Sequence, residues 1–169
     1  MSAKRLPGKP LLRINGKSII ARVFNKAKNC KIGKVIVATE DKIIANEIKK
    51  NGGKAILTSK KHNSGTDRIW EAFKKLKNNK IKYIINLQGD EPLIDINDIR
   101  SLNKIVKKNK FNIATLAIKL KNKKILNNKN IVKVAVKKKI SFRNPQKAIN
   151  FFRTSKKKYE NFFKADTLY

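Results

Sequence analysis

The residues that could do chemistry gather where an apolar run, residues 83–87, gives way to a polar turn containing Gly89, Asp90 and Pro92. We expect residues 83–87 to form a buried strand, and in open α/β sheets ligands bind outside the carboxyl ends of the strands. Gly89 has no Cβ, which lets the backbone approach a ligand closely, and Pro92 keeps the preceding residue out of the helical region. A carboxylate held there could share a Mg²⁺ ion with substrate phosphates. We therefore predict Asp90 as a metal ligand, although the same residues also fit an ordinary polar turn.

A cationic loop near the start of the chain is the second candidate. Pro7 and Pro10 restrict the backbone and Gly8 permits a tight bend, so Arg5 and Lys9 would be displayed from a stiff loop. An arginine fork matches phosphate oxygens, and a lysine acts as a compact point charge. The loop could therefore hold phosphates. By itself, however, the pattern fits a surface turn with two solvated cations better.

Residues 63–68 are the third candidate, because hydroxyl groups and a glycine precede a predicted helix there. The free N–H groups at the start of a helix can hold an anion or a polar base edge. An ordinary helix cap would explain Thr66 and Asp67, but it leaves Arg68 without a role. We expect the neighbouring His62 to be a solvated loop residue and Trp70 to serve packing.

The elements that must position these residues alternate between helical and β-branched patterns, which indicates βα units on a mostly parallel sheet. Ser18, Asp41 and Asp67 are the predicted N-caps of three helices. The expected helices cover residues 18–29, 41–48, 67–76 and 95–106, and the expected strands cover residues 34–39, 54–57, 83–87, 113–118 and 131–136. The pattern weakens after residue 137, and no linker is evident. We expect a single α/β domain over residues 1–169.

Several classes of protein are excluded by composition. Cys30 is the only cysteine, which rules out an internal disulfide framework and fits a reducing cytoplasm, and with one histidine a zinc site of soft ligands finds no support. The sequence has no apolar run long enough to span a bilayer and no secretory h-region near its start.

The charge has two readings. Lys and Arg number 43 against 11 Asp and Glu, a formal net charge of +32. Such an excess can mark a nucleic-acid surface. The excess is nearly all lysine, though, and it accompanies abundant Asn and Ile, as drift toward A- and T-rich codons would produce. Because the lysines are spread along the chain, we expect only non-specific binding to nucleic acid. Self-repulsion should weaken the compact state and make stability rise with salt.

Taken together and in this order, the three stretches resemble the 3-deoxy-manno-octulosonate (Kdo) cytidylyltransferase family, the CMP-Kdo synthetases of lipopolysaccharide precursor synthesis. Further segments that share the family pattern are residues 14–17, 35–39, 51–53, 114–117 and 132–134. The resemblance implies a Rossmann-like nucleotidyltransferase fold with a mostly parallel sheet in three αβα layers. It also implies CTP and Mg²⁺ as substrate and cofactor, a homodimer, and a cytoplasmic location.

The reaction of that family passes CMP from CTP to the anomeric hydroxyl of Kdo and releases pyrophosphate. By the resemblance, the loop of Arg5 and Lys9 embraces the triphosphate and Asp90 holds the metal, so these three are the predicted catalytic residues. The nucleotide-binding residues that the resemblance implies are Lys9, Ser64, Gly65, Thr66, Arg68, Gln88 and Gly89. No covalent nucleophile is needed, because such a site works by positioning and by neutralising developing charge.

The chain also departs from the family pattern. The opening strand and a phosphate-loop arginine ahead of Arg5 are missing, and so is the C-terminal part, so we expect an incomplete version of the fold. Glu40 stands where the family usually has aspartate. Two alternatives therefore stay open: an inactive truncated remnant, and a cytidylyltransferase for another acidic sugar such as sialic acid.

Overall fold

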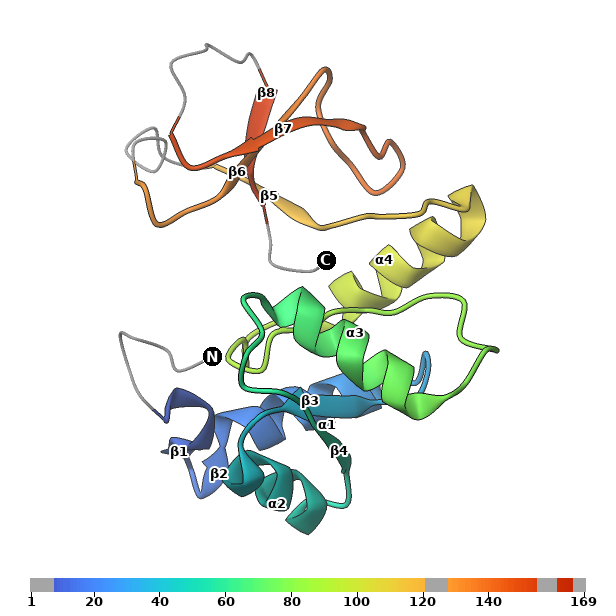
Figure 1. Ribbon diagram of the computed structural model, residues 1–169. Coiled ribbons are helices and arrows are strands. Elements are labelled where there is room, and N and C mark those ends of the chain that lie inside the picture. The colour runs from blue at the N-terminus through green and yellow to red at the C-terminus, as the bar shows by residue number, and fades with distance from the viewer. Residues whose placement is uncertain (1–7, 121–127, 155–160, 166–169) are drawn as a thin grey trace. The chain divides into compact units, whose positions relative to one another are not determined.

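A computed structural model describes residues 8–120, 128–154 and 161–165 of the chain. The chain divides into two compact units, residues 1–100 and residues 101–168 (Figure 1). The α/β class expected from the alternating patterns is confirmed, and each unit is described in turn below. None of the described helices is both long enough and apolar enough to cross a membrane.

The first unit contains three short elements followed by βα units. The short elements are the 3-10 helix η1 (Lys9–Leu11) and a hairpin of β1 (Arg13–Ile14) and β2 (Lys17–Ser18). The remaining elements are α1 (Ile19–Asn29), β3 (Ile36–Thr39), α2 (Lys42–Lys50), β4 (Lys54–Leu57) and α3 (Gly65–Leu76). A last helix, α4 (Ile96–Asn109), starts in this unit and ends in the second.

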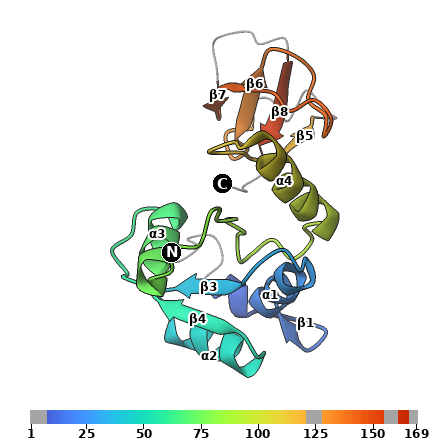
Figure 2. The same cartoon turned by 90° about the vertical axis from the view of Figure 1, so that its right-hand side faces the viewer.

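Strands β3 and β4 form the parallel pair that the sequence predicts. They run in register from Ile36 opposite Lys54 to Thr39 opposite Leu57, with α2 as the crossover between them. Helix α3 lies on one face of the pair and α2 on the other, as both views show (Figure 2). This is the αβα layering expected for the fold.

A small apolar core joins α1 and α2. Ile20, Phe24 and Ile48 are buried together. Gly53, at the start of β4, is required by this packing, because a Cβ there would lie 2.6 Å from a Phe24 ring carbon and 2.7 Å from the Ile48 Cγ2. The absence of a side chain at Gly53 therefore makes room for the core.

Two of the three predicted helix caps are confirmed and one is wrong. Ser18 Oγ accepts a hydrogen bond from the Ala21 N–H (3.3 Å), and Asp41 Oδ1 accepts one from the Ile43 N–H (2.7 Å). Helix α3, however, is capped by Ser64, whose Oγ accepts from the Asp67 N–H at 3.1 Å and donates to the Asp67 carboxylate at 2.7 Å. A serine and an acidic residue three positions apart form a reciprocal capping pair, so the helix begins at Gly65 rather than at Asp67.

The predicted strand at residues 83–87 is wrong as a strand. Residues 81–88 pair with no described strand, and the side chains of Tyr83 and Ile84 are 39% and 45% exposed. An apolar run shows that a segment can be buried, but a strand also needs a neighbour to complete its hydrogen-bond ladder. The segment nevertheless delivers Asp90 to the first unit, as described below.

The second unit holds a four-stranded antiparallel sheet. Its strands are β5 (Ala117–Lys119), β6 (Lys133–Val136), β7 (Ala148–Phe152) and β8 (Asn161–Ala165), in the order β5-β8-β6-β7. All three pairings are antiparallel, so the expected mostly parallel arrangement holds only for β3 and β4 among the described strands. The expected strand at residues 131–136 corresponds to β6, whereas the expected strand at residues 113–118 shares only residues 117 and 118 with β5.

A buried lysine ties this sheet to its connections. Lys133 is fully buried, and its ammonium donates to the carbonyl oxygens of Asn128 (2.7 Å) and Arg153 (2.6 Å). Burial lowers the pKa of Lys133, and the nearby charge of Arg153 lowers it further. A buried ammonium without these acceptors would be costly, so Lys133 fixes the residue 128–130 turn and the end of β7.

Candidate functional site

The cationic loop and the polar turn meet in the first unit. Lys9 Nζ lies 2.8 Å from Asp90 Oδ2, although the two residues are 81 positions apart in the chain. Both side chains remain accessible, at 35% and 39% exposure. Two residues that the sequence predicts for a phosphate and for a metal are therefore in direct contact.

The backbone around Lys9 is held by its neighbours. Gly8 adopts a left-handed conformation (φ 72°) that favours glycine, and its carbonyl accepts from the Leu11 N–H at 2.8 Å. Pro10 stands near the start of the 3-10 turn, where its missing N–H costs nothing. Leu11 packs against the Ile20 core. The lysine is therefore presented from an anchored turn.

Asp90 is held by a close approach of its own backbone to α1. A Cβ at Gly89 would lie 2.6 Å from Ile20 Cδ1. The Glu91 N–H donates to the Gln88 carbonyl at 3.3 Å, which turns the chain immediately around Asp90. Gly89, predicted to let the backbone approach a ligand, is also required by its closeness to the buried Ile20.

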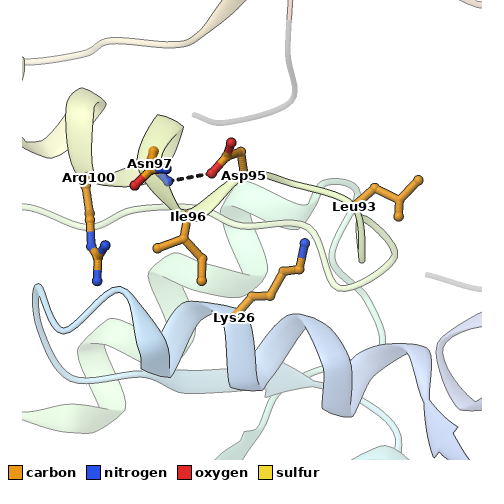
Figure 3. A pocket seen from close by; sticks show the side chains of 6 residues that line it. All are labelled: Lys26, Leu93, Asp95, Ile96, Asn97 and Arg100. Atoms are coloured by element: carbon orange, nitrogen blue, oxygen red, sulfur yellow. Dashed lines mark hydrogen bonds between the residues drawn. The ribbon is translucent and has the colours of Figure 1, made fainter.

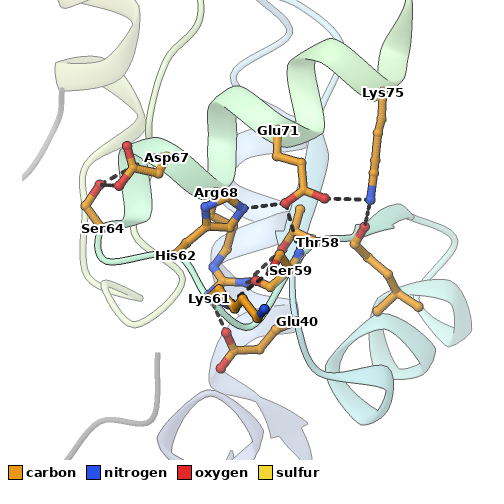
Figure 4. A network of polar contacts seen from close by, with 11 residues as sticks. Glu40, Thr58, Ser59, Lys61, His62, Ser64, Asp67, Arg68, Glu71 and Lys75 are labelled. Atoms are coloured by element: carbon orange, nitrogen blue, oxygen red, sulfur yellow. Dashed lines mark hydrogen bonds and ion pairs between the residues drawn. The ribbon is translucent and has the colours of Figure 1, made fainter.

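A polar network surrounds the third candidate stretch (Figure 4). Arg68, only 8% exposed, donates to Thr58 Oγ1 at 2.7 Å and to the Ser59 carbonyl at 3.3 Å, and it pairs with Glu40. Glu40 and Thr58 directly follow β3 and β4, so the guanidinium bridges the carboxyl ends of both parallel strands.

Glu71 forms the other half of this network. Its carboxylate accepts from the Ser59 N–H at 2.9 Å, pairs with Lys75 at 2.7 Å and contacts the His62 ring. Lys75, then His62 and the Ser59 amide, lower the pKa of Glu71 to about 2. The expectation that His62 is a solvated loop residue is therefore wrong, because the Glu71 carboxylate holds its ring.

The family follows from comparisons with known proteins. A family model described as cytidylyltransferase matches residues 1–167. The chain belongs to the cytidylyltransferase family. Two similar curated proteins are the 3-deoxy-manno-octulosonate cytidylyltransferases of Wigglesworthia glossinidia brevipalpis, at 42% identity, and of Fusobacterium nucleatum, at 46% identity. These relatives confirm the resemblance drawn from the motifs.

The matches differ in how much of each protein they cover. The two alignments take in 79% and 81% of this chain but 55% and 56% of the relatives, so the chain spans about half their length. A solved structure of a CMP:2-keto-3-deoxy-manno-octonic acid synthetase complexed with CTP matches with a TM-score of 0.82 and 33% identity, over 98% of this chain and 67% of that one. This match confirms the Rossmann-like nucleotidyltransferase fold of the cytidylyltransferase.

The predicted site residues fall into two groups in the first unit. Lys9, Gly89 and Asp90 meet at the ion pair, with Gln88 half-buried beside them. Ser64, Gly65 and Thr66 form the start of α3, and Arg68 lies one turn further. Arg5 lies outside the described residues. The roles of these residues stay predictions.

Sequence reasoning missed three residues of the polar network: Thr58, Ser59 and Glu71. Thr58 and Ser59 follow a predicted strand, which is where site residues gather in such sheets. Glu71 stands three positions after Arg68, so both lie on one side of α3. That spacing was readable in the sequence and is the signal that could have found Glu71.

The residues present fit a Mg²⁺ ion bound together with a nucleotide. Among the described residues no group of three or more His, Cys, Asp and Glu side chains gathers as an all-protein metal site. Mg²⁺ commonly uses one or two carboxylates and completes its shell with water and substrate phosphates. Asp90, accessible and next to a lysine, suits that incomplete ligand set.

A shallow hollow of about 450 Å³ is lined by Lys26, Leu93, Asp95, Ile96, Asn97 and Arg100 (Figure 3). Its two cationic lining residues donate to backbone carbonyls: Lys26 to the Ile94 carbonyl at 2.8 Å, and Arg100 to the carbonyls of Asn29 and Cys30 at 3.0 and 3.2 Å. The hollow therefore marks where the α4 start is fastened to α1.

Proposed function

We propose that this chain carries the nucleotide half of a cytidylyltransferase that transfers CMP from CTP to the anomeric hydroxyl of 3-deoxy-manno-octulosonate. The observation that carries the proposal is the 2.8 Å contact between Lys9 and Asp90. It joins a cation suited to phosphate and a carboxylate suited to a metal at one accessible point. The identities of the relatives and the CTP-bound structural neighbour support the same substrates.

The chemistry asks for positioning rather than for a covalent intermediate. The sugar hydroxyl oxygen forms a bond to the α-phosphorus of CTP, the bond to the bridging oxygen breaks, pyrophosphate leaves, and the hydroxyl proton passes to solvent. Lys9 would offset charge on the triphosphate, and Arg5 would add a fork-shaped contact. Asp90 would hold a Mg²⁺ ion, which when bound neutralises charge on phosphate oxygens. Ser64, Gly65, Thr66, Arg68, Gln88 and Gly89 would bind the rest of the nucleotide.

The test is pyrophosphate release from CTP, Kdo and Mg²⁺, compared between the wild-type chain and Asp90→Asn. Asn keeps the shape of Asp90 and removes the charge, and the 39% exposure of the side chain makes a folding defect a minor concern. We expect release to fall at least about a hundredfold, in the range seen when one preorganised charged group is removed from an active site. Equal rates would remove Asp90 from the site.

Two further measurements separate the two alternatives. An inactive remnant would bind no CTP–Mg²⁺ in a calorimetric titration, whereas micromolar binding would argue against a remnant. Offering sialic acid in place of Kdo distinguishes the acidic sugars. We further propose a cytoplasmic homodimer; sedimentation of the purified protein at several concentrations tests the dimer.

A further inference from the structure

The start of α1 supports both halves of the predicted phosphate and metal site. Leu11, two residues after Lys9, packs against the core cluster that contains Ile20. The backbone next to Asp90 approaches the same residue, because a Cβ at Gly89 would lie 2.6 Å from Ile20 Cδ1. The placement of Lys9 relative to Asp90 therefore depends on where the first turn of α1 lies.

The backbone that follows Lys9 is tied to that turn directly. The Leu12 N–H donates to the Lys9 carbonyl at 3.2 Å, which closes the 3-10 turn, and the Leu12 carbonyl accepts from the Ile19 N–H at 2.9 Å. Ile19 is the first residue of α1, so this bond satisfies one of the N–H groups that a helix leaves without an internal partner. A displacement of the α1 start would therefore also move Lys9.

A carboxylate on α2 fixes the α1 start. The N-cap residue Ser18 is buried, and its hydroxyl donates to Glu47 Oε1 at 2.7 Å while its oxygen accepts from the Ala21 N–H at 3.3 Å. A hydroxyl has a single hydrogen, so donating it to Glu47 leaves the oxygen lone pairs for the Ala21 amide. Glu47 therefore orients the cap of α1, and the same hydrogen bond joins α1 to α2.

The same carboxylate also contacts the β1–β2 hairpin, which lies between Lys9 and α1 in the chain. Glu47 Oε2 lies 3.5 Å from Arg13 Nη2, and Arg13 Nη1 donates to the Gly16 carbonyl at 2.7 Å. The side chain of Glu47 is only 13% exposed, but that of Arg13 is 61% exposed, so solvent weakens this ion pair. The hydrogen bond from Ser18 is therefore the stronger of the two restraints that Glu47 makes.

We infer that Glu47 and Ser18 are positioning residues that hold Lys9 in place beside Asp90. Neither Glu47 nor Ser18 touches the nucleotide in this scheme, because both act through the first turn of α1. The inference rests on the proposed function and deepens it. It assigns to a hydrogen bond between two helices the task of keeping the phosphate-binding lysine next to the metal-binding carboxylate.

Matched variants separate the hydrogen bond from the charge. Glu47→Leu removes the acceptor and keeps a comparable volume, and Ser18→Ala removes the hydroxyl at the other end of the bond. Glu47→Gln removes the charge but keeps an amide oxygen that can accept from Ser18, so it should restore most of what Glu47→Leu loses. Asn51→Ala is the control, because Asn51 Nδ2 donates to the backbone carbonyl of Glu47 at 2.8 Å and its loss leaves the carboxylate in place.

The experiment measures binding of Mg²⁺–CTP to the full chain by calorimetry, with each variant made in the wild-type chain and again in Lys9→Gln. In the wild-type background we expect Glu47→Leu and Ser18→Ala to lower the affinity about three- to tenfold, the worth of roughly one hydrogen bond. In the Lys9→Gln background the same changes should lower it less than about twofold, because the lysine that they position is absent. Glu47→Gln and Asn51→Ala should stay within about twofold of their parent chain in both backgrounds.

The outcomes separate the two proposals. A wild-type chain that binds no Mg²⁺–CTP refutes the proposed function and this inference with it. Wild-type binding with equal losses from Glu47→Leu in the presence and absence of Lys9 refutes the inference alone, because a defect that does not act through Lys9 adds to its removal. Unchanged affinity in both Glu47→Leu and Ser18→Ala also refutes it. Faster amide hydrogen exchange at Leu12 and Ile19 in Glu47→Leu, but not in Asn51→Ala, would support it.

Discussion

Replacing Lys9 by glutamine is expected to weaken the binding of Mg²⁺–CTP and at the same time to strengthen the binding of Mg²⁺ alone. In the ligand-free chain the Lys9 ammonium pairs with the Asp90 carboxylate, with Nζ 2.8 Å from Oδ2. A metal ion that approaches Asp90 without a nucleotide must displace this ammonium. A metal ion that arrives with a triphosphate brings phosphate oxygens to which Lys9 can transfer.

The magnitudes follow from the exposure of the pair. With side chains 35% and 39% exposed, the Lys9–Asp90 contact belongs with surface ion pairs, which contribute roughly 0.2–1 kcal/mol. Lys9→Gln should therefore lower the free energy of unfolding by less than about 1 kcal/mol and raise the affinity for free Mg²⁺ by no more than about fivefold. A hydrogen bond to a charged group is worth about 1.5–3 kcal/mol, so Mg²⁺–CTP affinity should fall roughly ten- to a hundredfold.

Calorimetric titrations with MgCl₂ alone and with Mg²⁺–CTP, together with thermal unfolding, measure all three quantities. Lys34→Gln is the matched control, because it makes the same charge change at an exposed position ahead of β3, at the opposite end of that strand from Glu40. Weaker binding of MgCl₂ to Lys9→Gln would refute the reasoning, and so would unchanged binding of Mg²⁺–CTP.

Three further predictions concern stability. Gly53→Ala should lower the free energy of unfolding, measured by urea titration, by about 1–3 kcal/mol, because the new Cβ would lie 2.6 Å from Phe24 and 2.7 Å from Ile48. The control Gly33→Ala should change this free energy little, because a Cβ at Gly33 would meet nothing within 4 Å. The pKa of Glu71 is lowered to about 2, so the ionised carboxylate stabilises the fold fully above its unfolded pKa near 4.5, and this stabilisation is lost as the pH falls toward 2. The difference in free energy of unfolding between wild type and Glu71→Gln should therefore vanish over that pH range. A difference that does not depend on pH would contradict this prediction. Because the chain carries a net charge of +32, its melting temperature should rise as NaCl is raised from low ionic strength toward about 0.5 M, since salt shortens the range of the repulsion between like charges. A flat or falling melting temperature would show that this repulsion does not limit stability.

The local elements of the first unit could be predicted from the sequence because their causes lie within a few residues. Helix α1 follows Ser18, and α2 follows Asp41, because a short polar side chain can accept a hydrogen bond two or three residues on. The β-branched runs predicted β3 and β4. The predicted cap of α3 was three residues too late because Asp67 also fits a cap, and only the hydrogen bond that Ser64 Oγ accepts from the Asp67 N–H decides between them.

The motifs predicted the members of the site but could assign only some of their partners. The ordered stretches around Lys9, Ser64 and Asp90 indicated the family, which the comparisons confirmed. Two contacts depend on segments that meet only after folding: the close approach of Gly89 to Ile20, and the contact between His62 and Glu71. Charge and spacing suggested a ligand for Arg68, whereas the fold supplies three protein acceptors.

The sequence by itself determined which residue types stand at each turn and in what order, because capping, periodicity and glycine placement act over short separations. Only the tertiary structure decided that Lys9 meets Asp90 across 81 positions and that residues 83–87 have no ladder partner among the described strands. The same holds for the antiparallel strands β7 and β8, which the weak pattern after residue 137 did not reveal. Contacts of this kind depend on which surfaces the whole chain can bury together, and no local window of residues contains that information.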